Sequence, residues 1–167
     1  MKDLLKLAQE CKEELDAIGI EYRTVRNWTV NTRAKCRWGQ CRPVSPGIFD
    51  INISSRLLDD QVTDNAVKNT IIHELLHTVE DCLKHTGKWK ALAAKVNRAY
   101  PQYHIQRVTS AEEKGVEKIV STYQINYKIT CTNCGRHTYR QKASKLVQHP
   151  EKFKCGICGG RLEVKKQ

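Results

Sequence analysis

The sequence lacks any apolar stretch long enough to cross a membrane. None of its apolar runs approaches the roughly 18 consecutive residues that a membrane-spanning helix needs. The N-terminus, Met1–Lys6, also lacks the apolar segment and the small-residue cleavage site of a secretory signal. We therefore expect a cytoplasmic protein, free or associated with the nucleoid, that does not act at a membrane.

Acidic residues are scarce in the last part of the chain. Residues 128–167 contain ten Lys or Arg but only two acidic residues, Glu151 and Glu163, which gives this segment a net charge of +8. The whole chain carries +11, so the segment holds most of the excess. Concentrated positive charge attracts polyanions, nucleic acid first among them. The pattern predicts DNA as a partner, single- or double-stranded. The alternative is a basic surface that serves only solubility.

The cysteines favour metal binding over disulfides. Without an export signal, the eight cysteines are expected in a reducing compartment, where they more often bind metal. Four of them form two Cys-x-x-Cys pairs separated by 20 residues, which is typical of a closed, structural zinc site. Such a site stabilises a small module and does not catalyse. The predicted ligands are Cys131, Cys134, Cys155 and Cys158. The other four cysteines are expected to be small buried residues.

The remaining pattern indicates an α+β domain. Apolar residues recur at helical spacing over 3–18, from about 63 to Leu83, and over 88–99. β-Branched and aromatic residues predict strands over 20–30 and 48–53, and clean alternation predicts another over 123–129. The stretch 31–42 is polar and basic, Pro43, Pro46 and Gly47 mark a turn, and residues 104–120 show no decisive pattern.

The sequence His73-Glu74-Leu75-Leu76-His77 lies within the second predicted helix. Histidines four residues apart lie on one helix face, offset by a rise of about 6 Å, and can bind the same zinc ion. Glu74, adjacent to the first ligand, can accept a proton from a zinc-bound water and pass it to the leaving amine. The motif predicts zinc-dependent peptide hydrolysis. The alternative is a pair of histidines on a purely structural helix.

A catalytic zinc usually has a third protein ligand. His85 is the preferred candidate because it follows His77 by eight residues, where a turn before Gly87 could fold it back towards the metal. Other acidic or histidine side chains remain alternatives: Glu80, Asp81, His104, and Glu112 or Glu113.

Together these motifs resemble the SprT-like metallopeptidase family, which includes the eukaryotic Spartan proteases. Four further segments carry the resemblance: Asn31-x-Arg33, Arg37-Trp38-Gly39-x-Cys41, His85-Thr86-Gly87-Lys88-Trp89 and Cys158-Gly159-Gly160-Arg161-Leu162. The resemblance implies a zincin-like α+β metallopeptidase domain with a small C-terminal zinc-ribbon β module. It also implies cleavage of proteins that are bound or crosslinked to DNA, as in DNA–protein crosslink repair.

We therefore expect a metallopeptidase domain over 1–122 and a basic zinc ribbon over 123–167. One catalytic Zn²⁺ would be held by His73, His77 and His85, and one structural Zn²⁺ by the four ribbon cysteines, with Glu74 as the catalytic group. The oxyanion donor stays open among Tyr100, Tyr103 and His104. Two other functions remain: a non-catalytic nucleic-acid-binding or regulatory zinc protein, and a peptidase with no nucleic-acid role.

Overall fold

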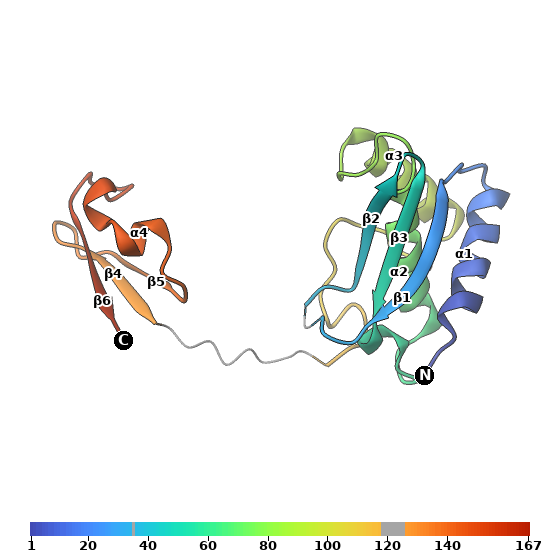
Figure 1. The fold of residues 1–167 in the computed structure, drawn as a ribbon, viewed down its shortest axis with the longest axis horizontal. Coiled ribbons are helices and arrows are strands. Elements are labelled where there is room, and N and C mark those ends of the chain that lie inside the picture. The colour runs from blue at the N-terminus through green and yellow to red at the C-terminus, as the bar shows by residue number, and fades with distance from the viewer. Residues whose placement is uncertain (35, 118–125) are drawn as a thin grey trace. The chain divides into compact units, whose positions relative to one another are not determined.

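The computed structural model describes residues 1–34, 36–117 and 126–167 (Figure 1). The chain divides into two compact units, Met1–Ile119 and Val120–Gln167. The first combines helices with a small sheet and the second is mostly strand, so the predicted α+β class is confirmed. Within the part of the chain that is described, no helix is both long and apolar enough to cross a membrane.

A three-stranded sheet forms one layer of the first unit. Its order is β1 (Thr24–Asn31), β3 (Ile48–Ser54) and β2 (Gly39–Ser45). Strand β3 pairs with β1 in parallel and with β2 in antiparallel orientation, and Gly47 turns the β2–β3 hairpin at a φ of 73°. Strand β2 was not predicted, because it is polar and contains Pro43. Proline is tolerated there because β2 is an outer strand of the sheet.

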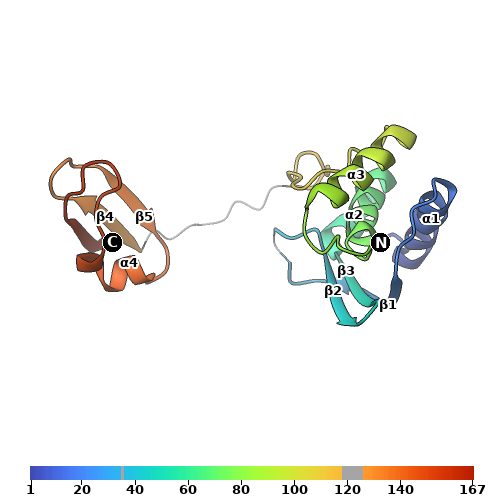
Figure 2. The same cartoon turned by 90° about the horizontal axis from the view of Figure 1, so that it is seen from above.

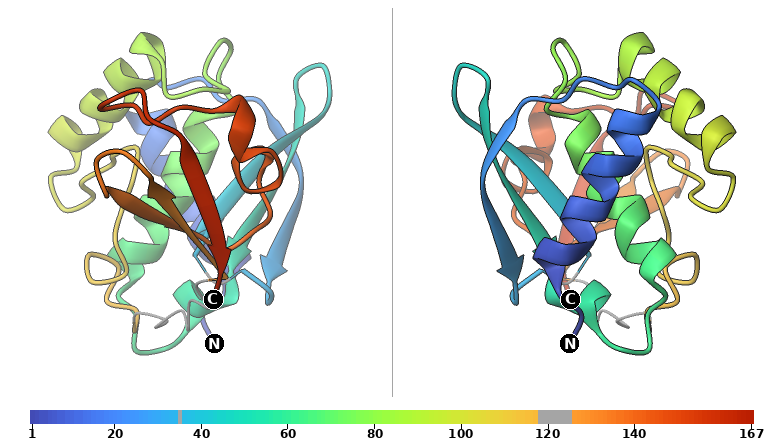
Figure 3. Two further views of the ribbon diagram at one scale, coloured as in Figure 1. Left: turned by 90° about the vertical axis from the view of Figure 1, so that its left-hand side faces the viewer. Right: turned by 90° about the vertical axis from the view of Figure 1, so that its right-hand side faces the viewer.

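Three helices cover one face of this sheet, as the view from above shows (Figure 2). They are α1 (Leu4–Ala17), α2 (Asp64–Leu76) and α3 (Gly87–Ala99), and a short 3₁₀ turn, Ser55–Leu58, follows β3. Helix α1 packs along α2 (Figure 3). Asp3 caps α1 by accepting from two backbone N–H groups, and Thr63 caps α2. Side-chain caps of this kind contribute about 1 kcal/mol each.

Helix α2 is the centre of the core. Val67, Ile71, Ile72, Leu75 and Leu76 are fully buried, on more than one face of the helix. Alternate residues of β3 and one face of α1 pack against them, which explains the periodicities of 2 and 3.6 seen in the sequence. A helix held on several sides is a rigid support for any side chain at its end.

The second unit is a three-stranded antiparallel sheet with two short helical turns. Strand β4 (Tyr127–Cys131) lies between β5 (His137–Arg140) and β6 (Leu162–Lys166), and the turns are α4 (Lys145–Gln148) and Pro150–Lys152. The predicted strand 123–129 falls partly outside the described residues, which begin again at Asn126. The buried apolar residues described in this unit are Ile129 and Cys131. So small a core needs additional stabilisation, which a metal can supply.

Candidate metal centres and active site

The helix that carries His73 and Glu74 ends earlier than its apolar pattern suggested. Helix α2 stops at Leu76, with His77 as its C-cap, and the predicted continuation to Leu83 is wrong. The Thr78 hydroxyl donates to the Leu75 carbonyl at 2.7 Å, and Asp81 adopts a φ of 62°, so the backbone leaves the helical path. This turn brings His85 back to the helix end.

Three imidazoles converge at the end of α2. His85 Nε2 lies 3.0 Å from His73 Nε2 and 3.2 Å from His77 Nε2. A zinc ion with Zn–N bonds of about 2.0–2.1 Å separates tetrahedral ligand nitrogens by about 3.3 Å, so the observed spacing suits one. The structure thus brings together the three histidines that the sequence analysis selected. None of the alternative ligands belongs to this metal-capable group.

The other ring nitrogens fix the tautomers. His73 Nδ1 lies 3.1 Å from the Gln106 carbonyl oxygen, and His77 Nδ1 lies 2.7 Å from the Cys82 carbonyl oxygen. A carbonyl only accepts hydrogen bonds, so each Nδ1 carries the proton and each Nε2 presents a lone pair. His85 can donate to only one of these two lone pairs. A cation satisfies all three nitrogens at once, so the residues present fit a metal.

The protonation states also suit metal binding. Burial, followed by the nearby His77 and His85, lowers the pKa of His73 to about 3. Burial also lowers the pKa values of His77 and His85. The buried Trp89 packs against all three imidazoles, with ring centroids 4.5–5.6 Å apart. The cluster is therefore neutral at physiological pH, which is the form that binds divalent metals.

Glu74 lies next to this cluster and is only 6% exposed. Burial raises the pKa of its carboxyl group to about 7. A hydrogen bond from the Cys41 backbone N–H and the positive charges of Arg37 and Lys114 act in the opposite direction. A carboxyl with a pKa near neutrality can both accept and return a proton, as a general base and acid must.

Gly39, the first residue of β2, gives Glu74 its space. A Cβ atom placed on Gly39 would lie 2.7 Å from both Cγ and Oε1 of Glu74. No real side chain tolerates such a contact, so position 39 must be glycine for Glu74 to keep this rotamer. The sequence offered Gly39 only as part of a family-like segment, with no sign of its contact.

We expect Gly39→Ala to lower kcat for peptide hydrolysis by roughly 10- to 100-fold, because it displaces the Glu74 carboxylate from its working position. Metal content should not change, since no histidine moves. Steady-state kinetics and metal analysis of the purified variant test this. Gly87→Ala is the matched control, because a Cβ there meets nothing within 4 Å. Equal activity of the two variants would show that the Gly39 contact is not functional.

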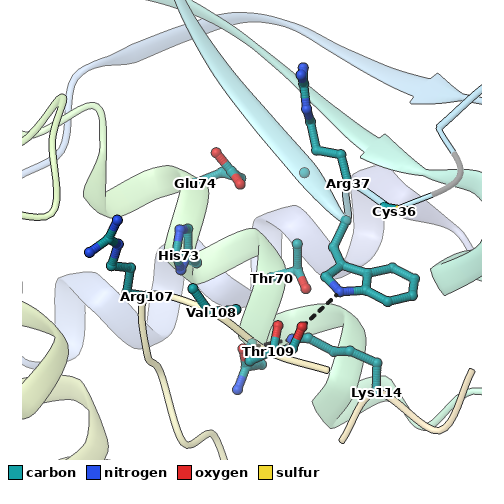
Figure 4. A pocket seen from close by; sticks show the side chains of 12 residues that line it. Cys36, Arg37, Thr70, His73, Glu74, Arg107, Val108, Thr109 and Lys114 are labelled. Atoms are coloured by element: carbon teal, nitrogen blue, oxygen red, sulfur yellow. Dashed lines mark hydrogen bonds between the residues drawn. The ribbon is translucent and has the colours of Figure 1, made fainter. Parts of the chain in front are cut away.

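A pocket beside His73 and Glu74 is completed by a segment without any sequence pattern (Figure 4). Residues 107–109 form one wall, and the Trp38 indole N–H donates to the Thr109 carbonyl at 3.2 Å. Lys114 also lines the pocket. Sequence reasoning missed this wall because residues 104–117, the described part of this stretch, form turns and loops, in which neither helical nor strand periodicity exists.

The three candidate oxyanion donors, Tyr100, Tyr103 and His104, lie outside the pocket beside Glu74. The Tyr103 hydroxyl donates to the Glu14 carboxylate, and the Tyr100 hydroxyl donates to the Glu14 carbonyl. Both tyrosines thus fasten the end of α3 to α1. His104 contributes to a different cavity, which it shares with Glu113. None of these three residues lines the pocket at Glu74.

The four ribbon cysteines form the second metal-capable group. The sulfurs of Cys131 and Cys158 are 3.5 Å apart, and those of Cys134 and Cys155 are 3.7 Å apart. Each Cys-x-x-Cys segment forms a similar turn. In the first, Gly135 adopts a positive φ and its N–H donates to the Cys131 carbonyl; in the second, Gly159 does the same with the Cys155 carbonyl. A hydrogen bond from the Gly160 backbone N–H, followed by side-chain hydrogen bonds from Cys134, Cys131 and Asn133, lowers the pKa of Cys158 to about 6, which favours the thiolate form that binds metal.

The remaining cysteines take no part in either cluster. All eight cysteines are free thiols in the structure. Cys11 and Cys82 are buried as expected, whereas Cys41 is half-buried and Cys36 is exposed.

A histidine triad at the end of a central helix, followed by a four-cysteine module, defines a metallopeptidase-like domain with a zinc-ribbon module. A comparison with known protein families identifies the family to which this domain belongs. Residues 5–110 match the SprT-like family, and the chain belongs to that family. A search of curated protein sequences found no significant match. The resemblance identified from the sequence motifs is confirmed.

Proposed function

We propose that this protein is a zinc-dependent endopeptidase that cleaves proteins bound or crosslinked to DNA. The observation that carries the peptidase part is the convergence of three histidine Nε2 atoms, 3.0–3.2 Å apart in two of their pairs, beside the buried Glu74 carboxyl. Zinc at these nitrogens would polarise a peptide carbonyl and make a water molecule more acidic. Glu74 takes the proton of the attacking water and delivers it to the leaving nitrogen.

The outer strand β2 offers a place for an extended peptide. Among the described residues its second edge pairs with no strand, and it begins at Gly39 beside Glu74. A substrate segment can add to such an edge through main-chain hydrogen bonds. That mode of binding recognises the main chain of unfolded or locally extended protein and leaves any side-chain preference to neighbouring pockets, which suits an enzyme that must act on many DNA-bound proteins.

The basic second unit supports the DNA part of the proposal. Its ten Lys and Arg residues stand against two acidic ones. Tyr139 and Phe153 are 43% and 40% exposed, and exposed aromatic rings between basic residues suit stacking with unpaired bases. A ribbon that holds DNA would concentrate the peptidase unit on proteins attached to the same DNA.

The direct test is cleavage of a DNA-binding protein by the full-length, zinc-loaded chain, with and without single- or double-stranded DNA. We expect cleavage to be faster when enzyme and substrate share a DNA molecule, to stop with a chelator and to return with Zn²⁺. Cleavage at a rate that DNA does not change would support the alternative of a peptidase without a nucleic-acid role. No cleavage by a fully zinc-loaded chain would favour the regulatory alternative.

The contribution of the ribbon to DNA binding can be measured from the salt dependence of DNA affinity. Replacing Lys165 and Lys166 with Gln removes two exposed charges from β6 and should reduce the slope of log K against log [salt] by up to about 2. The same change at Lys90 and Lys95, which are exposed on α3, should leave the slope unchanged. Fluorescence anisotropy with a labelled oligonucleotide gives both slopes. Equal slopes for the two double variants would argue against β6 as a DNA contact.

A further inference from the structure

The pocket beside His73 and Glu74 is strongly positive. It has a volume of about 220 Å³, which suits one amino-acid side chain better than a long ligand. Three basic residues line it, Arg37, Arg107 and Lys114, and Glu74 is the single acidic residue among its described lining residues. Figure 4 shows Arg107 and Lys114 on different sides of the pocket. The field inside the pocket therefore favours an anionic group.

Lys114 is the unusual member of this set, because it is only 3% exposed. Its Nζ donates to the Ala66 carbonyl at 3.2 Å and to Asn69 Oδ1 at 2.7 Å, both of which are neutral acceptors. Among the described residues, no carboxylate lies within ion-pair distance of Nζ. An ammonium group has three N–H donors, so one remains available.

A buried ammonium with no carboxylate in direct contact is energetically costly, and such groups concentrate at functional sites. Burial lowers the pKa of Lys114 to about 8, with Glu113 and Glu74 acting in the opposite direction, so the group still carries its charge at neutral pH. The Glu113 carboxylate is occupied elsewhere, since it accepts hydrogen bonds from the Ser110 backbone and from Gln106. The missing partner of Lys114 is therefore to be sought in a ligand.

We propose that this pocket is a substrate subsite for an acidic side chain, Asp or Glu, adjacent to the bond that is cleaved, with Lys114 as its anchor. The inference rests on the proposed peptidase function and specifies the substrate. The exposed Arg107 would attract the carboxylate at the entrance. A peptide is favoured over a DNA phosphate because His73, a proposed zinc ligand, and Glu74, the proposed general base, are walls of the same pocket.

Lys114 lies beyond residues 5–110, the part of the chain that matches the family. The turn that contains it is held by short-range contacts, because the Lys114 backbone N–H donates to the Ala111 carbonyl at 3.1 Å. The anchor of the proposed subsite therefore lies outside the part of the chain that the family match covers, whereas Arg107 and the other residues of the pocket lie within it.

A set of peptides that differ only by Glu, Gln or Lys at each position around the cleaved bond tests the proposal with the full-length, zinc-loaded protein. At one position we expect kcat/KM to fall by roughly 10- to 100-fold from Glu to Gln, the range of one charged hydrogen bond. Lys114→Met should abolish this Glu-to-Gln ratio, and Lys114→Glu should shift the preference to Lys. Lys95→Met, an exposed lysine on α3, should leave the ratio unchanged.

Several outcomes would overturn the subsite. The first is a Glu-to-Gln ratio of kcat/KM near one at every position. The second is a Lys114→Met variant that hydrolyses all peptides more slowly by the same factor and has a shifted pH profile of activity. The third is a preference only for peptides with a free C-terminal carboxylate. Loss of DNA affinity in Lys114→Met with an unchanged peptide ratio would identify a phosphate site instead. If Lys114→Met does not fold, Arg107→Gln, at an exposed position, should still reduce the ratio.

Binding separates this inference from the peptidase proposal. Affinities of the same peptides for zinc-loaded Glu74→Gln, measured by fluorescence anisotropy, should show the acidic preference without any turnover. Acidic preference in binding with no cleavage by the unmutated chain would retain the subsite and reject the peptidase. Cleavage by the unmutated chain without acidic preference in either assay would retain the peptidase and reject the subsite.

Discussion

Glu74→Gln is expected to reduce peptide hydrolysis by roughly 10²- to 10⁴-fold, the usual contribution of a general base. Glutamine keeps the shape of the side chain and can still accept the hydrogen bond from the Cys41 backbone N–H, but it cannot take a proton. The three histidines keep their carbonyl partners, so zinc content and thermal stability should match those of the unmutated protein.

The measurement is kcat/KM on a DNA-bound protein, together with zinc content and DNA affinity. Glu80→Gln is the matched control, because Glu80 lies just after the same helix, is exposed and pairs with Arg23 on the surface. We expect full activity from that control. Substantial hydrolysis by a zinc-loaded Glu74→Gln protein would show that the reaction does not use this carboxylate.

The double substitution Cys131→Ser with Cys134→Ser should unfold the second unit. Structural zinc sites contribute on the order of 10–16 kcal/mol of apparent binding energy, and the described core of this unit consists of little more than Ile129 and Cys131. Zinc content should fall from two ions per chain to one, and DNA affinity should fall with it. The first unit has its own core around α2 and should remain folded.

NMR or limited proteolysis distinguishes loss of one unit from loss of both, and metal analysis counts the ions. Cys36→Ser provides the control, because Cys36 is an exposed free thiol outside both clusters. Retention of two zinc ions by the double variant would mean that the four sulfurs do not form a metal site. Loss of both ions would show that the two units depend on each other.

The sequence predicted the buried elements of this fold well. Helices α1 and α3 and strand β3 were placed within a few residues of their observed bounds, because each buries one face and therefore shows a clear period. The candidate metal ligands were equally easy to find in the sequence, since metal binding requires specific residue types at short spacings. The sequence also suggested His85 as the third ligand, and the structure places it in one metal-capable group with His73 and His77, although its position depends on a turn with no periodic signal.

Elements with weak burial were missed or misplaced. Strand β2 carries no alternating pattern because it is a partly exposed edge strand, and α2 was extended too far because Val79 and Cys82 continue its apolar spacing after the helix has ended. The pocket wall at 107–109 and the buried Lys114 could not be found, because burial of a lysine is decided by tertiary packing and not by its neighbours in sequence.

Two of the three imidazoles are oriented by the main chain. The partners of His73 and His77 are the carbonyl oxygens of Gln106 and Cys82, and every amino acid supplies such an oxygen. Positions 106 and 82 can therefore change identity during evolution while their backbone continues to set the tautomers of both rings. We expect close relatives to keep at position 106 a half-buried side chain that can donate to Glu113, whereas its contact with the His73 ring places no demand on that side chain.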